Sequence, residues 1–293
     1  MLRRRLGKSS LEVSVVGLGA GNIGGPETRE HDVDRLLGAA LDAGVNLIDT
    51  ARSYGLSEER LGLALQDRRD QVVLSTKVGY GVPGIADWTR PCITAGVDAA
   101  LGRLSTDRID LVHLHSCPRE TLEHSGVVEA LVRTVEAGKV RVAAYSGEGD
   151  ALLWAVRSGA FGSIQCSVSL VDHAVLSGAV AEARARGEGV LAKRPLGNAP
   201  WRFTGRPQAP DVAEAWDRFR TLDLDHAGLE WSALSTRFSA FAEGVTSVLV
   251  GTGSPTHLLQ AVAALEQGPL PLATGESIQR AWTRHGADWP GRI

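Results

Sequence analysis

Residues 45–62 read VNLIDTARSYGLSEERLG and combine three kinds of local structure. The apolar residues of VNLI (45–48) indicate a buried strand, which ends at the carboxylate of Asp49. A loop of small residues then carries Tyr54, in a chain that has 3 tyrosines. Ser57 is expected to be the N-cap of a helix whose first turn contains glutamates. The stretch therefore predicts a strand–loop–helix unit with an acid and a phenol at the end of the strand.

The same kind of unit recurs along the chain. The apolar residues of each strand are crowded rather than strictly alternating, as in parallel strands that are buried on both faces. Eight such strands, alternating with helices over about 250 residues, predict a (β/α)8 TIM barrel with its active site at the carboxyl ends of the strands. A doubly wound sheet is disfavoured because no G-x-G-x-x-G follows the first strand. The predicted strands are 14–19, 45–50, 71–78, 109–116, 140–146, 163–169, 189–194 and 246–252.

Helical periodicity and turn residues complete the predicted architecture. An N-terminal β-hairpin with its turn at GKSS (7–10) is expected before the barrel, and the whole chain, 1–293, is expected to form one domain. The connection 195–245 after the seventh strand is long and irregular, which is more often a functional feature than an idle one. The predicted helices are 31–44, 90–104, 127–138, 150–159 and 255–268.

Composition excludes several classes of partner. The chain is 43% hydrophobic and 22% charged, with a net charge of −3, so no basic field indicates nucleic acid or an anionic membrane. Its three cysteines, Cys92, Cys117 and Cys166, lack the spacing of metal ligands and fit a reducing compartment. The basic start MLRRRLGKSS has no apolar region after it, and no run is long enough to span a membrane. We therefore expect a cytoplasmic protein.

Four polar side chains lie at the predicted strand ends: Asp49, Lys77 and His115, with Tyr54 on the loop after Asp49. Each by itself is explained more simply as a surface, capping or packing residue. On one rim of a barrel, however, they form a proton donor. A lysine ammonium favours the phenolate and lowers the pKa of a tyrosine, and an aspartate keeps the lysine charged. A histidine beside the phenol can hydrogen-bond the same substrate oxygen.

These motifs resemble the aldo-keto reductase family over essentially the whole chain. The resemblance implies reversible hydride transfer, without a metal, between a nicotinamide cofactor and an aldehyde, ketone or alcohol. It implies that Tyr54 is the general acid, Lys77 its pKa partner, Asp49 the anchor of the lysine and His115 the carbonyl-orienting group. The segments that carry the resemblance include NLIDTARSYGLSEERLG (46–62), VVLSTKVG (72–79), IDLVHLHS (109–116), GKVRVAAYSGE (138–148), GVLAKRPLGNAPW (189–201) and VLVGTGSPTHL (248–258).

The same resemblance implies cofactor contacts. Ser146 and Gln165 occupy the positions that hold the nicotinamide carboxamide, a task that needs a donor and an acceptor. Gly147 stands where the family usually has asparagine. Lys193 and Arg194 stand where it tends to have an aromatic ring, so they either stack on the nicotinamide or grip the pyrophosphate.

The far end of the cofactor is expected near a helix that begins at Pro255. Thr252 and Ser254 precede this helix, whose N-terminus suits an anion. Gly251 and His257 replace the lysine and arginine that the family often uses for a 2′-phosphate. NADP(H) is therefore the expected cofactor, with NAD(H) possible. Further candidate contacts are Gly19, Ala20, Asp49, Pro195 and Leu196.

A non-catalytic cofactor-binding regulatory subunit on the same barrel is the main alternative, which the intact set of four residues disfavours. A metal-dependent hydrolase would need a cluster of metal ligands. His113 and His115 supply two, and no third ligand is evident in the sequence. His113 is expected to point away from the site, into the core or toward the helices. Asn22, Trp88 and Trp201 are candidate substrate contacts in an open site that accepts aldehydes, ketones or open-chain sugars.

Overall fold

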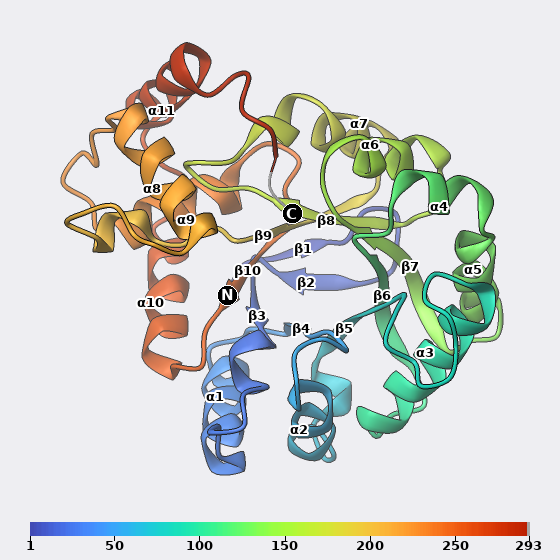
Figure 1. The fold of residues 1–293 in the computed structure, drawn as a ribbon. Coiled ribbons are helices and arrows are strands. Elements are labelled where there is room, and N and C mark those ends of the chain that lie inside the picture. The colour runs from blue at the N-terminus through green and yellow to red at the C-terminus, as the bar shows by residue number, and fades with distance from the viewer. Residues whose placement is uncertain (292–293) are drawn as a thin grey trace.

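Parallel strands close into a barrel at the centre of the molecule (Figure 1). The computed structural model describes residues 1–291, so the last two positions of the predicted domain lie outside it. The strand order around the barrel is β10-β3-β4-β5-β6-β7-β8-β9, which confirms the predicted (β/α)8 TIM barrel. The barrel strands are β3 (Val16–Gly19), β4 (Leu47–Asp49), β5 (Val73–Val78), β6 (Ile109–His115), β7 (Val140–Ser146), β8 (Ser163–Ser167), β9 (Gly189–Lys193) and β10 (Ser247–Gly251).

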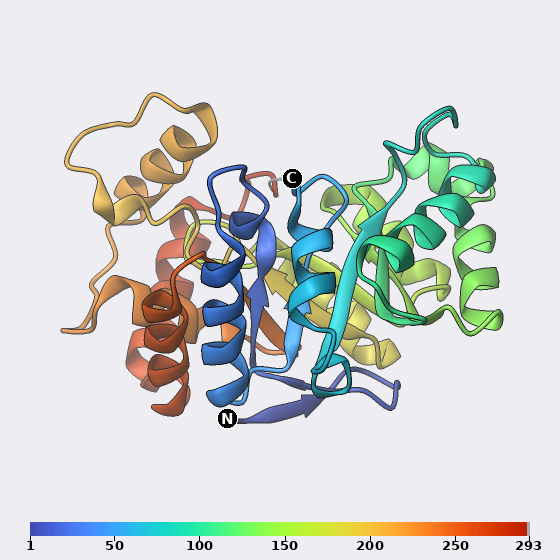
Figure 2. The same ribbon diagram turned by 90° about the horizontal axis from the view of Figure 1, so that it is seen from below.

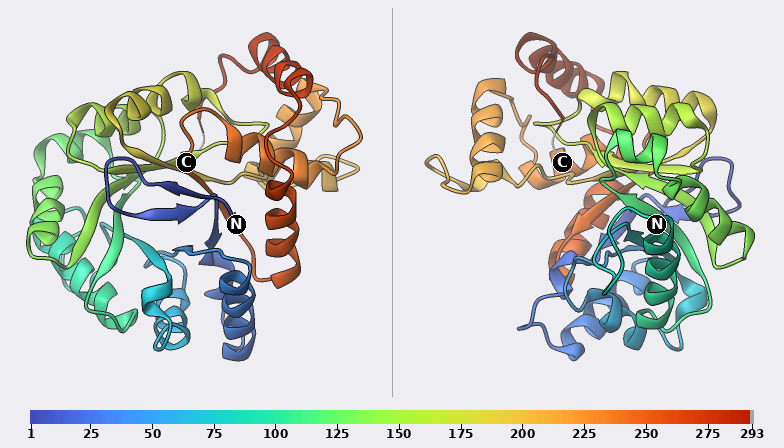
Figure 3. Two further views of the ribbon diagram at one scale, coloured as in Figure 1. Left: turned by 180° about the vertical axis from the view of Figure 1, so that it is seen from behind. Right: turned by 45° about the vertical axis from the view of Figure 1, so that its right-hand side comes forward.

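Helices surround the strands on the outside of the barrel, as the two views of Figure 3 show. Their buried faces are apolar and pack on the outward-facing strand residues in one large core. The helices are α1 (Glu30–Asp42), α2 (Ser57–Ala64), α3 (Arg90–Arg103), α4 (Arg119–His124), α5 (Val127–Glu136), α6 (Gly149–Ser158), α7 (Ala179–Arg186), α8 (Pro210–Leu222), α9 (Trp231–Phe241), α10 (Pro255–Glu266) and α11 (Leu272–His285). Short 3₁₀ turns are η1 (Ala20–Ile23), η2 (Arg69–Gln71), η3 (Ala174–Ser177) and η4 (Pro200–Arg202).

The predicted N-terminal hairpin is confirmed and closes one end of the barrel. It consists of β1 (Arg3–Arg5) and β2 (Glu12–Ser14), which pair antiparallel. Leu6, Leu11 and Val13 of this hairpin form a buried cluster with apolar side chains from the barrel interior. In Figure 2 the dark blue hairpin lies at the opposite end of the barrel from the gold segment that follows β9. The amino-terminal end of the barrel is thus filled with apolar side chains, which leaves the carboxyl end for the polar ones.

The predicted N-cap of α2 is wrong by one residue. Helix α2 begins at Ser57, and Leu56 is its N-cap. The Ser57 hydroxyl is used elsewhere: it donates to the Ala20 carbonyl oxygen and accepts from Thr50 Oγ1, both at 2.8 Å. This serine therefore ties the loop that carries Tyr54 to the end of β3 instead of capping the helix.

The connection after β9 is more ordered than the predicted irregular loop. It contains η4 and α8 before it reaches α9 and β10. Pro210 is at the start of α8, where its fixed φ suits a first helical turn. Ala215 and Leu222 of α8 are buried in a cluster with Val171 and Trp282. The segment is thus a packed extension beside the carboxyl end of the barrel (Figure 2).

Candidate active site

Side chains that point into the barrel change from apolar to polar toward the carboxyl end of strands β5 and β6. Because successive residues of a strand alternate between its two faces, Leu111, His113 and His115 of β6 all point inward. Leu111 lies in the apolar cluster beside the hairpin, whereas the histidines lie nearer the carboxyl end. Strand β5 repeats this order from Val73 to Lys77. The polar inward-facing residues are thereby gathered at one end of the barrel.

Lys77 and Asp49 form a buried ion pair at this end. The Lys77 Nζ atom is 2.6 Å from Asp49 Oδ2 and 2.7 Å from the Thr50 carbonyl oxygen. Burial alone would lower the pKa of Lys77, but the Asp49 carboxylate, and then Tyr54, raise it above its usual value. Burial alone would raise the pKa of Asp49, but Lys77 and then His113 bring it below its usual value. Both groups are therefore charged in the folded protein.

Tyr54 lies directly over this pair. The Lys77 Nζ atom is 4.9 Å from the centroid of the Tyr54 ring. The loop is held in place by backbone hydrogen bonds from Tyr54 N to the Ala51 carbonyl at 3.0 Å and from Ser57 N to the Tyr54 carbonyl at 3.1 Å. The half-buried phenol is thus placed between the buried ammonium and the open rim.

His115 faces the same space from β6. Its ring is edge-on to the Tyr54 ring, with centroids 6.3 Å apart and an interplanar angle of 89°. Burial, and then the positive charge of Lys77, lower the pKa of His115 to about 3, against the opposing effect of Asp49. At neutral pH the imidazole is therefore uncharged and acts as a hydrogen-bonding group. The structure thus brings all four predicted residues together.

The sequence predicts that His113 points away from this site, but the structure shows that it points toward the site. It faces the barrel interior with His115, since the two residues are two apart on one strand. Its Nε2 atom is 3.1 Å from Ser75 Oγ, which in turn donates to Asp49 Oδ1 at 2.7 Å. Burial lowers the pKa of His113 to about 4. His113 is therefore a neutral residue that supports Ser75 and, through it, the ion pair.

Ser146 and Gln165 also lie at the rim and are linked to the ion pair. Ser146 Oγ donates to Gln165 Oε1 at 3.1 Å, and Gln165 Nε2 donates to Asp49 Oδ1 at 3.0 Å. The residue after this serine is Gly147, and a Cβ atom there would lie 2.5 Å from the Tyr145 hydroxyl. The Tyr145 side chain thus occupies the space that an asparagine at position 147 would need.

A cleft of about 1180 Å³ opens over these residues. Asp49, Tyr54 and His115 line it, while Lys77 is 1% exposed and lies beneath Tyr54. The predicted substrate contact Trp88 does not line the cleft. The other predicted residues that do line it are Gly19, Asn22, Ser146, Gln165, Lys193, Arg194, Pro195, Leu196, Trp201, Gly251, Thr252, Ser254 and His257.

Two predicted contacts lie outside the cleft for identifiable reasons. Ala20 is 0% exposed, and its carbonyl oxygen accepts the hydrogen bond from Ser57, so the chain has turned inward there. Trp88 packs edge-on against Tyr80, with ring centroids 5.8 Å apart, and its indole fills the space beside Gly79. Trp201, by contrast, lines the cleft and stacks on Trp231 at 6.1 Å.

Comparison with known proteins decides the family. The family model described as Aldo/keto reductase family matches residues 15–282. The chain belongs to this family. A solved structure of aldo-keto reductase AKR11C1 from Bacillus halodurans, in its holo form, superimposes with a TM-score of 0.83 at 26% identity and covers 96% of both chains.

Curated relatives differ in what they do. L-galactose dehydrogenase of Arabidopsis thaliana is 27% identical over 283 residues, which is 90% of this chain and 88% of that protein. A protein named "Probable voltage-gated potassium channel subunit beta", also of Arabidopsis thaliana, is 36% identical over 122 residues, or 39% of this chain and 37% of that protein. The relatives of this chain thus include a dehydrogenase and, over a shorter stretch, a protein named as a probable channel subunit.

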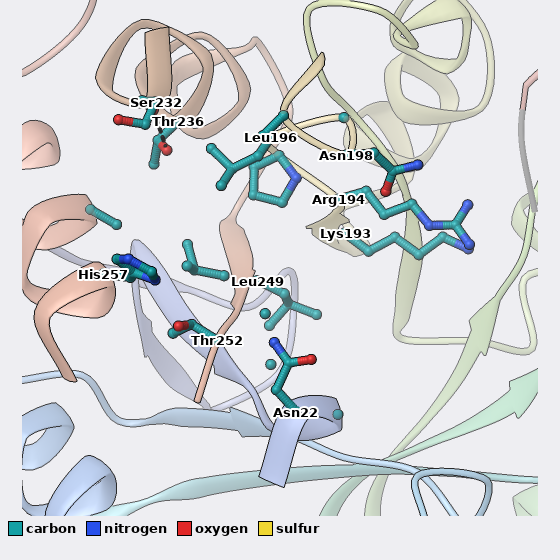
Figure 4. Close-up of a pocket in the computed structure, with 18 of the residues that line it drawn as sticks. Asn22, Lys193, Arg194, Leu196, Asn198, Ser232, Thr236, Leu249, Thr252 and His257 are labelled. Carbon is teal, nitrogen blue, oxygen red and sulfur yellow. Dashed lines mark hydrogen bonds between the residues drawn. The ribbon is translucent and has the colours of Figure 1, made fainter. Parts of the chain in front are cut away.

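The cleft has the shape and donor set of a nicotinamide dinucleotide site. Ser146 and Gln165 supply a donor and an acceptor beside Tyr54, which suits a carboxamide. Figure 4 shows Thr252 and His257 on one side of the cleft and the extended side chains of Lys193 and Arg194 on the other. Basic side chains and the N-terminus of α10 suit phosphate groups. The residues present therefore fit such a cofactor.

Lys193 is held by a buried acid that the sequence patterns did not reveal. Its Nζ atom is 3.2 Å from Glu148 Oε1, which also accepts a 2.7 Å hydrogen bond from the backbone N–H of Ser167. Glu148 follows Ser146 by two residues, which is the signal that could have located it at the end of β7. A second missed residue is Tyr80, whose hydroxyl oxygen is 2.6 Å from His115 Nδ1. It lies three residues after Lys77, just beyond β5.

Within residues 1–291, no group of three or more His, Cys, Asp or Glu side chains is arranged to hold a metal ion. None of the helices described is both long enough and apolar enough to cross a membrane. The three cysteines are buried free thiols in this range.

Proposed function

We propose that this protein is an NAD(P)H-dependent reductase of aldehydes and ketones, or in the reverse direction a dehydrogenase of the corresponding alcohols, with Tyr54 as the general acid. The observation that carries this proposal is the position of the Tyr54 phenol, between the buried Lys77–Asp49 pair and the neutral His115 imidazole, on the wall of the cleft. A general acid must lie within hydrogen-bonding reach of the oxygen that it protonates, and the rim of the cleft provides that position.

The residues divide the chemistry among them. When bound, a reduced nicotinamide would supply the hydride that the carbonyl carbon accepts. Tyr54 transfers its hydroxyl proton to the carbonyl oxygen, which becomes the hydroxyl of the product alcohol. Lys77 stabilises the tyrosinate that is left, and Asp49 holds the ammonium in place. His115 polarises the carbonyl by a hydrogen bond, which an uncharged imidazole can donate.

The cofactor is proposed to be NADP(H), with NAD(H) as a usable second choice. Charged side chains on a 2′-phosphate form hydrogen bonds worth about 1.5–3 kcal/mol each, or about 10- to 150-fold in affinity. Gly251 supplies no such group. We therefore expect a preference for NADPH over NADH below about 100-fold, measured by fluorescence titration of both cofactors at pH 8. A preference above about a thousandfold would assign the 2′-phosphate to another side chain, with Arg202 of the cleft wall as the first candidate.

Replacing Gly251 with arginine is expected to strengthen the preference for NADPH by at least about tenfold. A Cβ atom at this position has no heavy atom within 4 Å, so the new side chain can be accommodated at the lip of the cleft. Fluorescence titration of NADPH and NADH against the variant measures the effect. Gly102→Arg is the matched control, because Gly102 is equally open but lies in α3, outside the cleft. Equal shifts in both variants would mean that net charge alone, and not position 251, causes the change.

The substrate is proposed to be a small aldehyde, ketone or open-chain sugar. Asn22 and Trp201 line the same cleft as Tyr54, so a polar and an aromatic side chain are available to a bound carbonyl compound. A panel of such carbonyls, followed by NAD(P)H absorbance, tests the function. Absence of turnover with every member of the panel, in a protein that binds the cofactor, would favour a cofactor-binding regulatory subunit. The channel-subunit relative is the observation that keeps this second function under test.

The protein is proposed to act in the cytoplasm on small molecules, without nucleic acid or membrane partners. Its net charge of −3 gives no overall attraction to polyanions, which supports this proposal.

A further inference from the structure

Tyr80 contacts the candidate active site through His115. Its hydroxyl oxygen lies 2.6 Å from His115 Nδ1, and the two rings are stacked with centroids 5.6 Å apart and an interplanar angle of 23°. His115 lines the cleft, whereas Tyr80 does not. The Nδ1 atom of His115 is therefore occupied by Tyr80, which leaves Nε2 for a bound substrate.

The Tyr80 ring is itself fixed by the loop between β5 and α3. Trp88 packs against it edge-on at 5.8 Å, and Trp88 N donates to the Gly79 carbonyl oxygen at 2.8 Å. The indole fills the space beside Gly79, where a Cβ atom would lie 2.1 Å from the Trp88 ring. Gly81 N donates to Asp87 Oδ1 at 2.9 Å, which closes the loop. The phenol is thus held in place against His115.

The chemistry of His115 depends on which ring nitrogen carries its proton. Burial and Lys77 keep the imidazole neutral, so one nitrogen donates a hydrogen bond and the other accepts one. A carbonyl oxygen only accepts, so the nitrogen that faces the cleft must carry the proton. The tautomer of a histidine is set by the hydrogen bond that its other nitrogen makes. A phenol that donates to Nδ1 leaves the proton on Nε2.

We propose, on the basis of the carbonyl-reductase function above, that Tyr80 is a positioning residue that donates its hydroxyl proton in a hydrogen bond to His115 Nδ1 and thereby holds His115 as the Nε2–H tautomer. Tyr80 acts on the substrate through His115 and transfers no proton during the reaction. The candidate substrate contact Trp88 then contributes indirectly, because it supports the Tyr80 ring.

Nitrogen chemical shifts of ¹⁵N-labelled histidine read this tautomer directly. The protein has 8 histidines, and loss of one signal in His115→Asn assigns that of His115. In the wild-type protein at pH 7 we expect Nε2 to carry the proton and Nδ1 to have the shift of a hydrogen-bonded acceptor. In Tyr80→Phe, which keeps the ring and removes the hydroxyl, we expect the two nitrogen shifts to move toward each other as the tautomers mix. A protonated Nδ1 in the wild-type protein, or unchanged shifts in Tyr80→Phe, would overturn the assignment.

Steady-state kinetics provide a second test of the role of Tyr80. Loss of one neutral hydrogen bond is expected to lower kcat of Tyr80→Phe by about 2- to 12-fold, with KM for the carbonyl and the dissociation constant of NADPH nearly unchanged. Tyr145→Phe is the matched control: its hydroxyl donates to the Cys117 carbonyl oxygen at 2.9 Å, outside the cleft, so neither kcat nor the His115 shifts should change. An equal fall in kcat for both variants would contradict a specific role for Tyr80. If the wild-type protein reduces no carbonyl, the proposed function fails, and the shifts alone still decide the tautomer.

Discussion

Replacing Tyr54 with phenylalanine is expected to lower kcat for carbonyl reduction by about 10²- to 10⁴-fold, the usual contribution of a general acid. The variant keeps the ring that lies over Lys77 and loses only the hydroxyl group that carries the proton. The dissociation constant of NADPH should remain close to that of the wild-type protein, because the phenol contributes little to holding a dinucleotide. Steady-state kinetics with the best carbonyl of the panel and fluorescence titration of NADPH measure the two quantities.

Tyr145→Phe is again the matched control for this experiment. The substitution is chemically identical, but the Tyr145 hydroxyl is bound to the Cys117 carbonyl on the outside of the barrel. Its kcat is expected to equal that of the wild-type protein. If Tyr54→Phe retained more than about a tenth of the wild-type kcat, Tyr54 would not be the acid, since that loss is below the range of general acid catalysis.

Replacing Lys77 with methionine is expected to abolish turnover or to raise the apparent pKa that controls reduction, because the ammonium that favours the tyrosinate is gone. It is also expected to lower the free energy of unfolding by about 3–5 kcal/mol. The reason is that Asp49, 4% exposed, loses the partner that lies 2.6 Å away and becomes an uncompensated buried charge. Denaturant unfolding and the pH dependence of kcat measure the two effects.

The double variant Lys77→Met/Asp49→Asn separates stability from catalysis. It removes both charges, and the asparagine can still accept hydrogen bonds from Ser75 and Gln165 through its side-chain oxygen. We expect it to regain most of the lost stability, since replacing a whole buried pair costs much less than breaking it. Activity should remain lost. Near-native activity and an unchanged pH profile in Lys77→Met would refute the role assigned to this lysine.

The barrel could be predicted because its strands are recognisable one at a time. Runs such as VVLSTKV (72–78) are apolar on both faces, and helices with one apolar face separate them, so local pattern alone indicates a parallel sheet covered by helices. The hairpin was predictable for a similar reason, since its turn residues lie between two short strands. The structure of the connection after β9 was harder to predict from the sequence, because α8 is stabilised by packing against Trp282, which is distant in sequence.

The four residues of the centre were also predictable. Three of them lie at the carboxyl ends of strands and Tyr54 lies on the loop after one, and strand ends in a barrel share one rim. The direction in which individual side chains point was harder to predict from the sequence. His113 was expected to point away from the site, although the period of a strand places it on the same side as His115. Serine is a common N-cap residue, but the Ser57 hydroxyl instead donates a hydrogen bond to the Ala20 carbonyl oxygen. The helix begins at Ser57 itself. A tertiary hydrogen bond thus replaced the local one.

By itself, the sequence determined the architecture of the barrel and the residues at its carboxyl end, because both follow from local periodicity. The tertiary structure alone decided which side chains meet. The contact between Tyr80 and His115 and the ion pair between Lys193 and Glu148 each join residues from different strand ends or loops. Such pairs depend on strand register and on side-chain direction, which short-range pattern does not encode. Closure of the barrel supplies both, because it places every strand between two fixed neighbours.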